Sequence, residues 1–313
     1  MALPRMPFLR RIACLVPIAV IGVLVALNWP LVASGGRGLL TANRYWLLAA
    51  LAVTALGWVA VSFARQGAVL EPLPARRLFA TQFASGAANH LLPAGLGAGA
   101  VNLRFLRGCG IPLTRSSAAL ALYLLAEAAV RLVLLLTLLA AFPDALRLDG
   151  LLPQAAALPL VWAAGGLLCT ALLALIAIRP LRRAVAAFAG TALTDARALH
   201  ARPTRALALW GGSLAFPVLQ AAGLVAVALA LDVPVPVIHV AIAYLSASIA
   251  AAAVPTPGGI GSVDAALVIA LVAAGASVTA AGSVVLGYRI ITVWLPLIPG
   301  ALVLGALVRS KVI

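Results

Sequence analysis

Two stretches rich in proline and glycine decide how this chain folds: Pro93-Ala-Gly-Leu-Gly97 and Pro257-Gly-Gly-Ile-Gly261. Each interrupts an apolar segment, and a similar set of residues follows each one. The first is followed by Gly110, Thr114 and Tyr123, and the second by Gly275, Thr279 and Tyr288. Pro93 and Pro257 are 164 residues apart, whereas Gly110 and Gly275 are 165 apart. We interpret the two stretches as one motif used twice, the alternative being a chance match in a chain rich in Ala, Leu and Gly.

The composition places the chain in a lipid bilayer. Hydrophobic residues make up 65% of the sequence, charged residues only 9%, and the mean hydropathy is +1.16. Soluble domains contain about 25% charged residues, so no soluble class fits. Six apolar runs are long enough to cross about 30 Å of hydrocarbon; they are Ile12 to Val32, Tyr45 to Ala64, Ser117 to Phe142, Ala155 to Ile178, Ala206 to Leu231, and Val278 to Val308.

The two remaining apolar pieces predict broken-helix hairpins, each centred on one of the proline-glycine breaks. The first extends from Leu78 to Phe105, and the second combines Val237 to Val254 with Ser262 to Ala274. Interrupted helices in corresponding halves of a membrane protein indicate a binding site near the bilayer midplane, because freed backbone groups are tolerated only where they line a cavity. The expected fold is therefore an all-α polytopic integral membrane protein with about six full spans and two broken-helix or re-entrant hairpins.

The positions of the basic residues predict the topology of the chain. The net charge of +15 would suggest nucleic acid as the partner of a soluble protein, but here most arginines fall on one side of the predicted spans. The exceptions are Arg37, Arg44 and Arg147. The positive-inside rule then predicts a multi-pass cell-membrane protein with both termini in the cytoplasm and a cytoplasmic basic loop over 179–205. Residues 1–313 would form one membrane domain in which the repeats, approximately 78–142 and 237–308, are inverted.

Four ionisable residues lie within predicted membrane segments: Glu127, Arg131, Asp264 and Arg289. Each would cost about 2.5–3.5 kcal/mol on insertion scales, so each is expected to have a partner or a function. Their charges sum to zero, which suits a bundle interior and a site for a zwitterionic or anionic headgroup. Glu127 and Arg131 have the spacing of an ion pair on one helix face, and they could simply orient helices.

Asp264 has a simple structural explanation, whereas Arg289 has none in its own helix. Asp264 could stabilise the first turn of the helix that begins near Gly261, with no role in binding. Arg289, next to Tyr288, has no acidic neighbour within a helical turn. Its partner must therefore come from elsewhere in the fold or from a ligand phosphate, which arginine binds well through its planar fork.

Glycines and polar residues at the breaks complete the candidate site. A half-helix that starts inside the membrane presents unpaired N–H groups and a positive dipole end, which favours anion binding at Gly258, Gly259 and Gly261. The same glycines could serve only close packing and sharp turns. Asn89 and His90 precede the first break. His90 could bind a headgroup or act as an interhelical hydrogen-bonding residue. No cofactor or metal is expected, because the three cysteines lack metal-type spacing.

These residues resemble a known family, the flippase-like membrane domain of lysylphosphatidylglycerol synthases, here as a stand-alone member. The resemblance rests on residues 89–97 (Asn-His-Leu-Leu-Pro-Ala-Gly-Leu-Gly), on Gly110-Ile-Pro followed by the Glu127 helix, on residues 255–264 (Pro-Thr-Pro-Gly-Gly-Ile-Gly-Ser-Val-Asp), and on Gly275 with Tyr288-Arg289. Family members usually have Glu where Asp264 stands. They also commonly place an acid and an arginine after the first break, where this chain has Ala98 and Gly99, and they carry a Glu-Arg-x-x-Asp pattern that is here Glu127 with Arg131.

The resemblance implies a protein that binds and translocates a membrane phospholipid or polyprenyl-linked phosphate through a central polar cavity. In that interpretation Arg289 and the half-helix N-termini hold phosphate, and Asp264 or Glu127 meets a cationic group. Two-domain family members carry a soluble aminoacyl transferase after the membrane part, which this sequence lacks, so an enzymatic role is disfavoured. The alternatives are a membrane subunit or scaffold for a separate glycosyl or lipid transferase, and an intramembrane lipid-modifying enzyme. No nucleic acid partner is expected.

Overall fold

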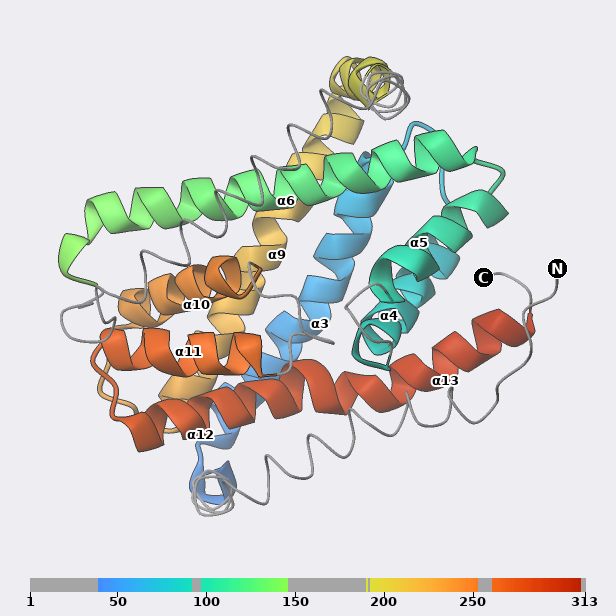
Figure 1. Ribbon diagram of the computed structural model, residues 1–313. Coiled ribbons are helices and arrows are strands. Elements are labelled where there is room, and N and C mark those ends of the chain that lie inside the picture. The colour runs from blue at the N-terminus through green and yellow to red at the C-terminus, as the bar shows by residue number, and fades with distance from the viewer. Residues whose placement is uncertain (1–38, 92–96, 146–189, 191, 253–260, 311–313) are drawn as a thin grey trace, which may run out of the picture.

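The computed structural model describes residues 39–91, 97–145, 190, 192–252 and 261–310, and every regular element in these ranges is a helix (Figure 1). Four helices are long and apolar enough to cross a membrane: α3 (Arg44–Gly67), α6 (Leu113–Ala141), α9 (Pro203–Ala230) and the continuous helix Val278–Arg309. They coincide with four of the predicted spans, so the all-helical membrane class is confirmed. The other two predicted spans, Ile12 to Val32 and Ala155 to Ile178, lie outside the described residues.

Shorter helices form the two hairpins. The first consists of α4 (Ala75–Leu91) and α5 (Gly97–Gly108), and the second of α10 (Val237–Ala252) and α11 (Ser262–Ala273). The helices stop next to the two proline-glycine breaks, most of whose residues lie outside the described ranges. In Figure 1 the α4–α5 pair and the α10–α11 pair lie on opposite sides of the molecule, with the end of α4 and the start of α11 toward its middle. The long helix α6 and the C-terminal helix run in opposite directions along two edges of the same view.

The helix boundaries of the two hairpins correspond closely. The helix α5 spans 97–108 and α11 spans 262–273, while the next helices begin at 113 and 278, so each boundary is displaced by 165 residues. A glycine with positive φ lies two residues beyond the end of each short helix, with φ of +85° at Gly110 and +106° at Gly275. The residue after each glycine donates its N–H to a carbonyl five residues earlier, Ile111 to Leu106 and Ala276 to Leu271. This is the Schellman ending, which favours glycine because it has no Cβ to clash in a left-handed conformation.

Helices α3 and α9 cross the molecule as a closely packed antiparallel pair. The start of α3 is tied to the end of α9 by the N–H of Asn43, which donates to the Ala230 carbonyl at 2.9 Å. At the other end, a Cβ on Gly67 would lie 2.2 Å from the backbone nitrogen of Leu209, and a Cβ on Gly212 would lie 2.5 Å from that of Ala64. Small residues therefore allow the two backbones to touch, as is common between membrane helices.

The C-terminal helix joins two separate apolar cores. Its first part, α12 (Val278–Arg289), packs with α9, α10 and α11 in a core that includes Leu224, Leu267 and Val284. Its last part, α13 (Leu295–Arg309), packs against α4 beside a second core that includes Ala84 and Phe105. A π-helical turn, η4 (Ile290–Trp294), connects them. Pro296 follows this turn and has no N–H to continue the α-helical ladder, which explains the local widening.

Large apolar side chains cover the outer surface of the long helices. On α6, Leu125 is 67% exposed and Val133 62%, and on α13, Ile298 is 70% exposed and Leu302 71%. Such continuous apolar exposure is unfavourable in water, whereas it matches the hydrocarbon of a bilayer. The polar side chains that the sequence singled out turn inward instead.

Candidate functional site

A cavity of about 450 Å³ lies where both hairpins meet the long helices. The first hairpin contributes the C-terminal half of α4 and the start of α5, and the second contributes α10 and α11. The polar and charged residues that line the cavity are Thr54, Arg65, Gln82, Ser85, Asn89, His90, Tyr123, Arg131, Gln220, Tyr244, Ser248, Tyr288, Arg289 and Thr292. Five of the predicted site residues, Asn89, His90, Arg131, Tyr288 and Arg289, therefore share one space.

Asp264 and Arg289 form an ion pair at the edge of this cavity. The Arg289 Nε donates to Asp264 Oδ1, and the side chains are 13% and 32% exposed. The other carboxylate oxygen of Asp264 accepts the backbone N–H of Gly261 at 2.9 Å, which caps α11. Asp264 thus acts as the first-turn carboxylate that the sequence allowed, and it is also the partner of Arg289, a pairing that the sequence did not identify. Gly261, whose N–H the carboxylate accepts, adopts a φ of +89° at the start of the helix, a conformation that favours glycine. Gly258 and Gly259 lie outside the described residues.

Glu127 and Arg131 form the predicted pair on one face of α6. The distance between Arg131 Nη2 and Glu127 Oε1 is 2.5 Å, and the two side chains are 18% and 14% exposed. The Arg131 guanidinium carbon also lies 5.9 Å from the ring centroid of Phe216. Arg131 lines the cavity, so this pair orients one of the cationic groups that face the cavity.

Tyrosines and an amide form a hydrogen-bonded part of the wall. The hydroxyl of Tyr288 donates to Gln220 Oε1 at 2.5 Å, and the rings of Tyr244 and Tyr288 meet edge to face with centroids 6.1 Å apart. The sequence prediction did not include Gln220. A lone amide within the apolar run of α9 is the signal that could have identified it, because a polar side chain at that depth needs a partner.

Polar residues from the first hairpin close the cavity on the α4 side. Asn102 of α5 donates to Ser85 Oγ at 2.7 Å and accepts from Gln82 Nε2 at 3.2 Å, which ties α5 to α4. Asn89 and His90 stand at the end of α4, before the break, and both line the cavity. The Nδ1 atom of His90 is buried and has no hydrogen-bond partner in the described part of the chain.

Arg65 also lines the cavity, although the charge pattern of the sequence placed it on the basic face of the membrane. It belongs to the last turn of α3, and its guanidinium carbon lies 3.9 Å from the ring centroid of Tyr123. No sequence signal separates it from the other arginines that follow predicted spans. Only the packing of α3 against α6 and α9 shows that this arginine faces inward.

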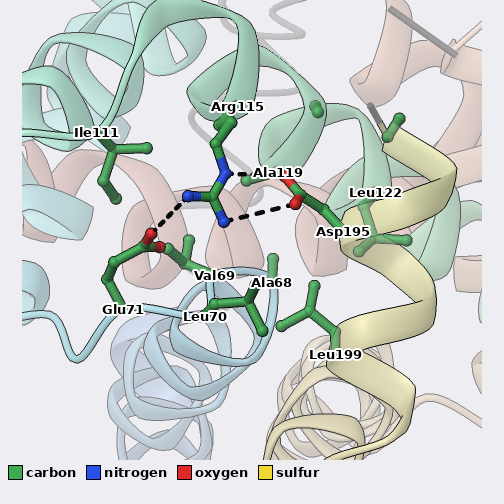
Figure 2. Close-up of a pocket in the computed structure, with 12 residues that line it drawn as sticks. Ala68, Val69, Leu70, Glu71, Ile111, Arg115, Ala119, Leu122, Asp195 and Leu199 are labelled. Carbon is green, nitrogen blue, oxygen red and sulfur yellow. Dashed lines mark hydrogen bonds and ion pairs between the residues drawn. The ribbon is translucent and has the colours of Figure 1, made fainter. Parts of the chain in front are cut away.

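A second site that contains an arginine lies near the end of α3 and the start of α6, and its pocket is much smaller than the central cavity (Figure 2). Arg115 donates to Glu71 Oε1 at 2.9 Å and to Asp195 Oδ2 at 3.1 Å, and Figure 2 shows its guanidinium held between the two carboxylates. Three segments that are distant in sequence are joined in this way. The pocket around them has a volume of about 10 Å³, which leaves space for one water molecule at most.

Metal ligation is not suggested by the described side chains, since no three His, Cys, Asp or Glu residues within those ranges form a metal-binding group. The site is therefore best described by its cationic and amide donors. What it can do chemically is bind an anion, because guanidinium groups and amides donate hydrogen bonds to phosphate oxygens.

Comparison with known proteins gives one family. The family model described as the lysylphosphatidylglycerol synthase TM region matches residues 14–300, which is nearly the whole chain. No curated protein matches the sequence. The match relates the chain to the handling of lipids in membranes, in agreement with the exposed apolar faces of its long helices. This multi-pass membrane protein thus belongs to the family of the lysylphosphatidylglycerol synthase transmembrane region.

Proposed function

We propose that this protein binds the phosphate-bearing headgroup of a phospholipid or of a polyprenyl-linked lipid in its central cavity and translocates it across the bilayer. The observation that carries the proposal is the convergence of Arg131, Arg289 and the end of α4 on one cavity between two hairpins. The volume of about 450 Å³ lies within the range of small-molecule sites, roughly 300–1,000 Å³. Its position among membrane helices suits a ligand whose acyl chains stay in lipid.

The separation of the two apolar cores suggests how the headgroup would move from one leaflet to the other. The α12 half of the C-terminal helix packs in one core, and the α13 half packs beside the other. The π-helical turn between them directly follows Arg289. Because π-helical turns are often found at functional sites, we take this turn as the hinge. Rocking of one hairpin unit against the other about η4 would expose the cavity to each leaflet in turn.

The same proposal includes the orientation of the chain. The described ends of α3, α5 and α13 and the starts of α4, α6 and α9 carry arginines, whereas the opposite ends carry Arg44. The positive-inside rule then favours a cell-membrane protein with both termini in the cytoplasm. Labelling of single cysteines placed at each end of the chain in intact cells would test it. Labelling of either terminus by an impermeant reagent would contradict it.

Translocation by the purified full-length protein is the direct test. The protein is reconstituted into liposomes that contain a trace of headgroup-labelled or acyl-labelled fluorescent phospholipid, and a membrane-impermeant reductant reports the fraction of label in the outer leaflet over time. The parent protein should accelerate exchange between leaflets over protein-free liposomes. Failure to accelerate exchange of any anionic or zwitterionic phospholipid, or of a polyprenyl phosphate, would refute the proposal.

Arg289→Ala should slow translocation by about tenfold or more, because it removes a charge-assisted hydrogen-bond donor from the cavity. Arg309→Ala is the matched control, since Arg309 is an exposed arginine at the end of the same helix. The control should retain the parent rate. Equal translocation rates for the two variants would show that Arg289 takes no part in binding the headgroup, whereas a protein that only scaffolds a separate transferase would not accelerate exchange in any form.

A further inference from the structure

Arg65 differs from the other two arginines of the cavity in its partners. Arg131 is paired with Glu127, and Arg289 with Asp264. In the described part of the chain, no carboxylate is paired with Arg65, whose guanidinium instead lies against the Tyr123 ring. Its Nε is buried without a hydrogen-bond partner in those same ranges, as is the Nε of Arg131.

The charge of the cavity follows from these pairings. Three arginines line it, and two carboxylates neutralise two of them, which leaves one positive charge among the described residues. The residues of the two breaks, 92–96 and 253–260, contain no ionisable side chain and so cannot change this count. An unneutralised cation in the interior of a membrane protein is costly unless a ligand or another group balances it.

We infer that the cavity selects a phosphodiester headgroup with a net charge of minus one over a zwitterionic one, and that Arg65 sets this preference. This inference rests on the proposed function and names its substrate class. A phosphodiester without an ammonium group would bring the cavity to neutrality. A zwitterionic headgroup would leave the excess positive charge in place and would bring its ammonium near arginines, where like charges repel.

The geometry of Arg65 leaves it able to bind phosphate oxygens. The Tyr123 ring lies against the guanidinium at 3.9 Å, and an aromatic ring in that position covers a face of the planar group. The N–H donors point outward in the guanidinium plane, so they remain free to hydrogen-bond an anion. The Arg131 guanidinium carbon lies farther from an aromatic ring, 5.9 Å from the centroid of Phe216, and its Nε also has no hydrogen-bond partner in the described structure. Two arginines that line the cavity, Arg65 and Arg131, therefore each retain an unused N–H donor.

The test measures lipid retained by the purified full-length protein. The parent, Arg65→Gln, Arg65→Lys and Arg104→Gln are each equilibrated in mixed micelles that contain equal amounts of phosphatidylglycerol, with one negative charge, and phosphatidylcholine, which is zwitterionic. After removal of excess lipid, mass spectrometry gives the ratio of the two bound lipids. Arg104 is an exposed arginine of α5, so Arg104→Gln makes the same change in charge away from the cavity.

The parent should retain phosphatidylglycerol over phosphatidylcholine by about tenfold, and Arg65→Gln should remove most of that preference. Arg104→Gln should keep the preference of the parent. Arg65→Lys restores the charge without the planar fork, so it should keep the preference but bind less lipid in total. If Arg65→Gln does not remain monodisperse, the total lipid bound by Arg65→Lys is the test instead, and total binding equal to that of the parent would contradict a contact between Arg65 and the headgroup.

Two results would overturn the inference: a parent ratio near one, or an Arg65→Gln ratio equal to that of the parent. Either result could coexist with measurable translocation in liposomes, so a failure here is distinguishable from a failure of the proposed function. A parallel titration with soluble glycerol 3-phosphate separates a lipid site from a site for free phosphate compounds. Binding of the soluble compound with loss at Arg65→Gln, but no retained lipid, would support the anion site and refute lipid as its ligand.

Discussion

The two arginine sites of this protein show how similar residues can have different roles. Arg115 is held between Glu71 and Asp195 in a pocket of about 10 Å³, and its partly exposed guanidinium donates to both carboxylates. The central cavity, about 450 Å³, is lined by three arginines. Arg131 and Arg289 are each paired with a carboxylate, Arg65 is paired with none in the described ranges, and the Nε atoms of Arg65 and Arg131 have no hydrogen-bond partner there. An arginine that is fully paired with carboxylates in a pocket without free volume, such as Arg115, links chain segments. Arginines that are incompletely paired beside a cavity leave room for a ligand.

The largest effect on stability is expected from Glu127→Gln. This change leaves Arg131 buried without its counter-charge, and breaking a buried pair costs about 3–5 kcal/mol of unfolding free energy. Denaturant unfolding in detergent, followed by helical signal, would measure the loss. The double variant Glu127→Gln with Arg131→Met should recover much of it, because both charges are then absent. A loss below about 1 kcal/mol in the single variant would mean that Arg131 is solvated as Arg115 is.

An intermediate effect is expected from Asp264→Asn. The amide oxygen can still accept the Gly261 N–H, but the charge that neutralises Arg289 is lost. Because the Asp264 side chain is 32% exposed, we expect a stability loss of only about 1–2 kcal/mol. Retention of phosphatidylglycerol should rise, since the cavity gains one net positive charge. Unchanged or lower retention in the mixed-micelle measurement would show that the Asp264 carboxylate does not compete with the ligand for Arg289.

The smallest effect is expected from Glu71→Gln at the Arg115 site. Partly exposed pairs contribute about 0–1 kcal/mol, and Asp195 continues to hold Arg115 after the change. The loss should decrease further at high salt, because exposed charges are screened. The ratio of bound lipids should remain that of the parent. A stability loss as large as that of Glu127→Gln, or a changed lipid ratio, would remove the distinction between the two sites.

The features that could be predicted are those that depend on residues close together in the sequence. Glu127 and Arg131 are one helical turn apart, so their pairing could be read from spacing alone. Gly110 and Gly275 were matched as corresponding positions of the two repeats, and the structure places both at Schellman endings, where a left-handed residue favours glycine. The four described spans follow in the same way from the length of their apolar runs.

Other features depended on contacts between distant segments. Arg289 was expected to need a remote partner, but periodicity could not identify Asp264, which lies 25 residues earlier across the turn between α11 and α12. The Tyr288–Gln220 hydrogen bond joins residues 68 positions apart. The inward position of Arg65 had no signal at all, because its neighbours in sequence resemble those of the surface arginines.

Composition and local pattern were thus enough to establish a helical membrane protein with two interrupted hairpins, because the bilayer imposes the same requirement on every backbone segment that crosses it. Which charged side chains lie close together was decided only by the packing of the helices against one another. Arg65, Arg131 and Arg289 come from three different helices, and their convergence depends on how closely those helices approach one another. The distance between two packed helices depends on many small residues along their interface, so no short motif in the sequence specifies it.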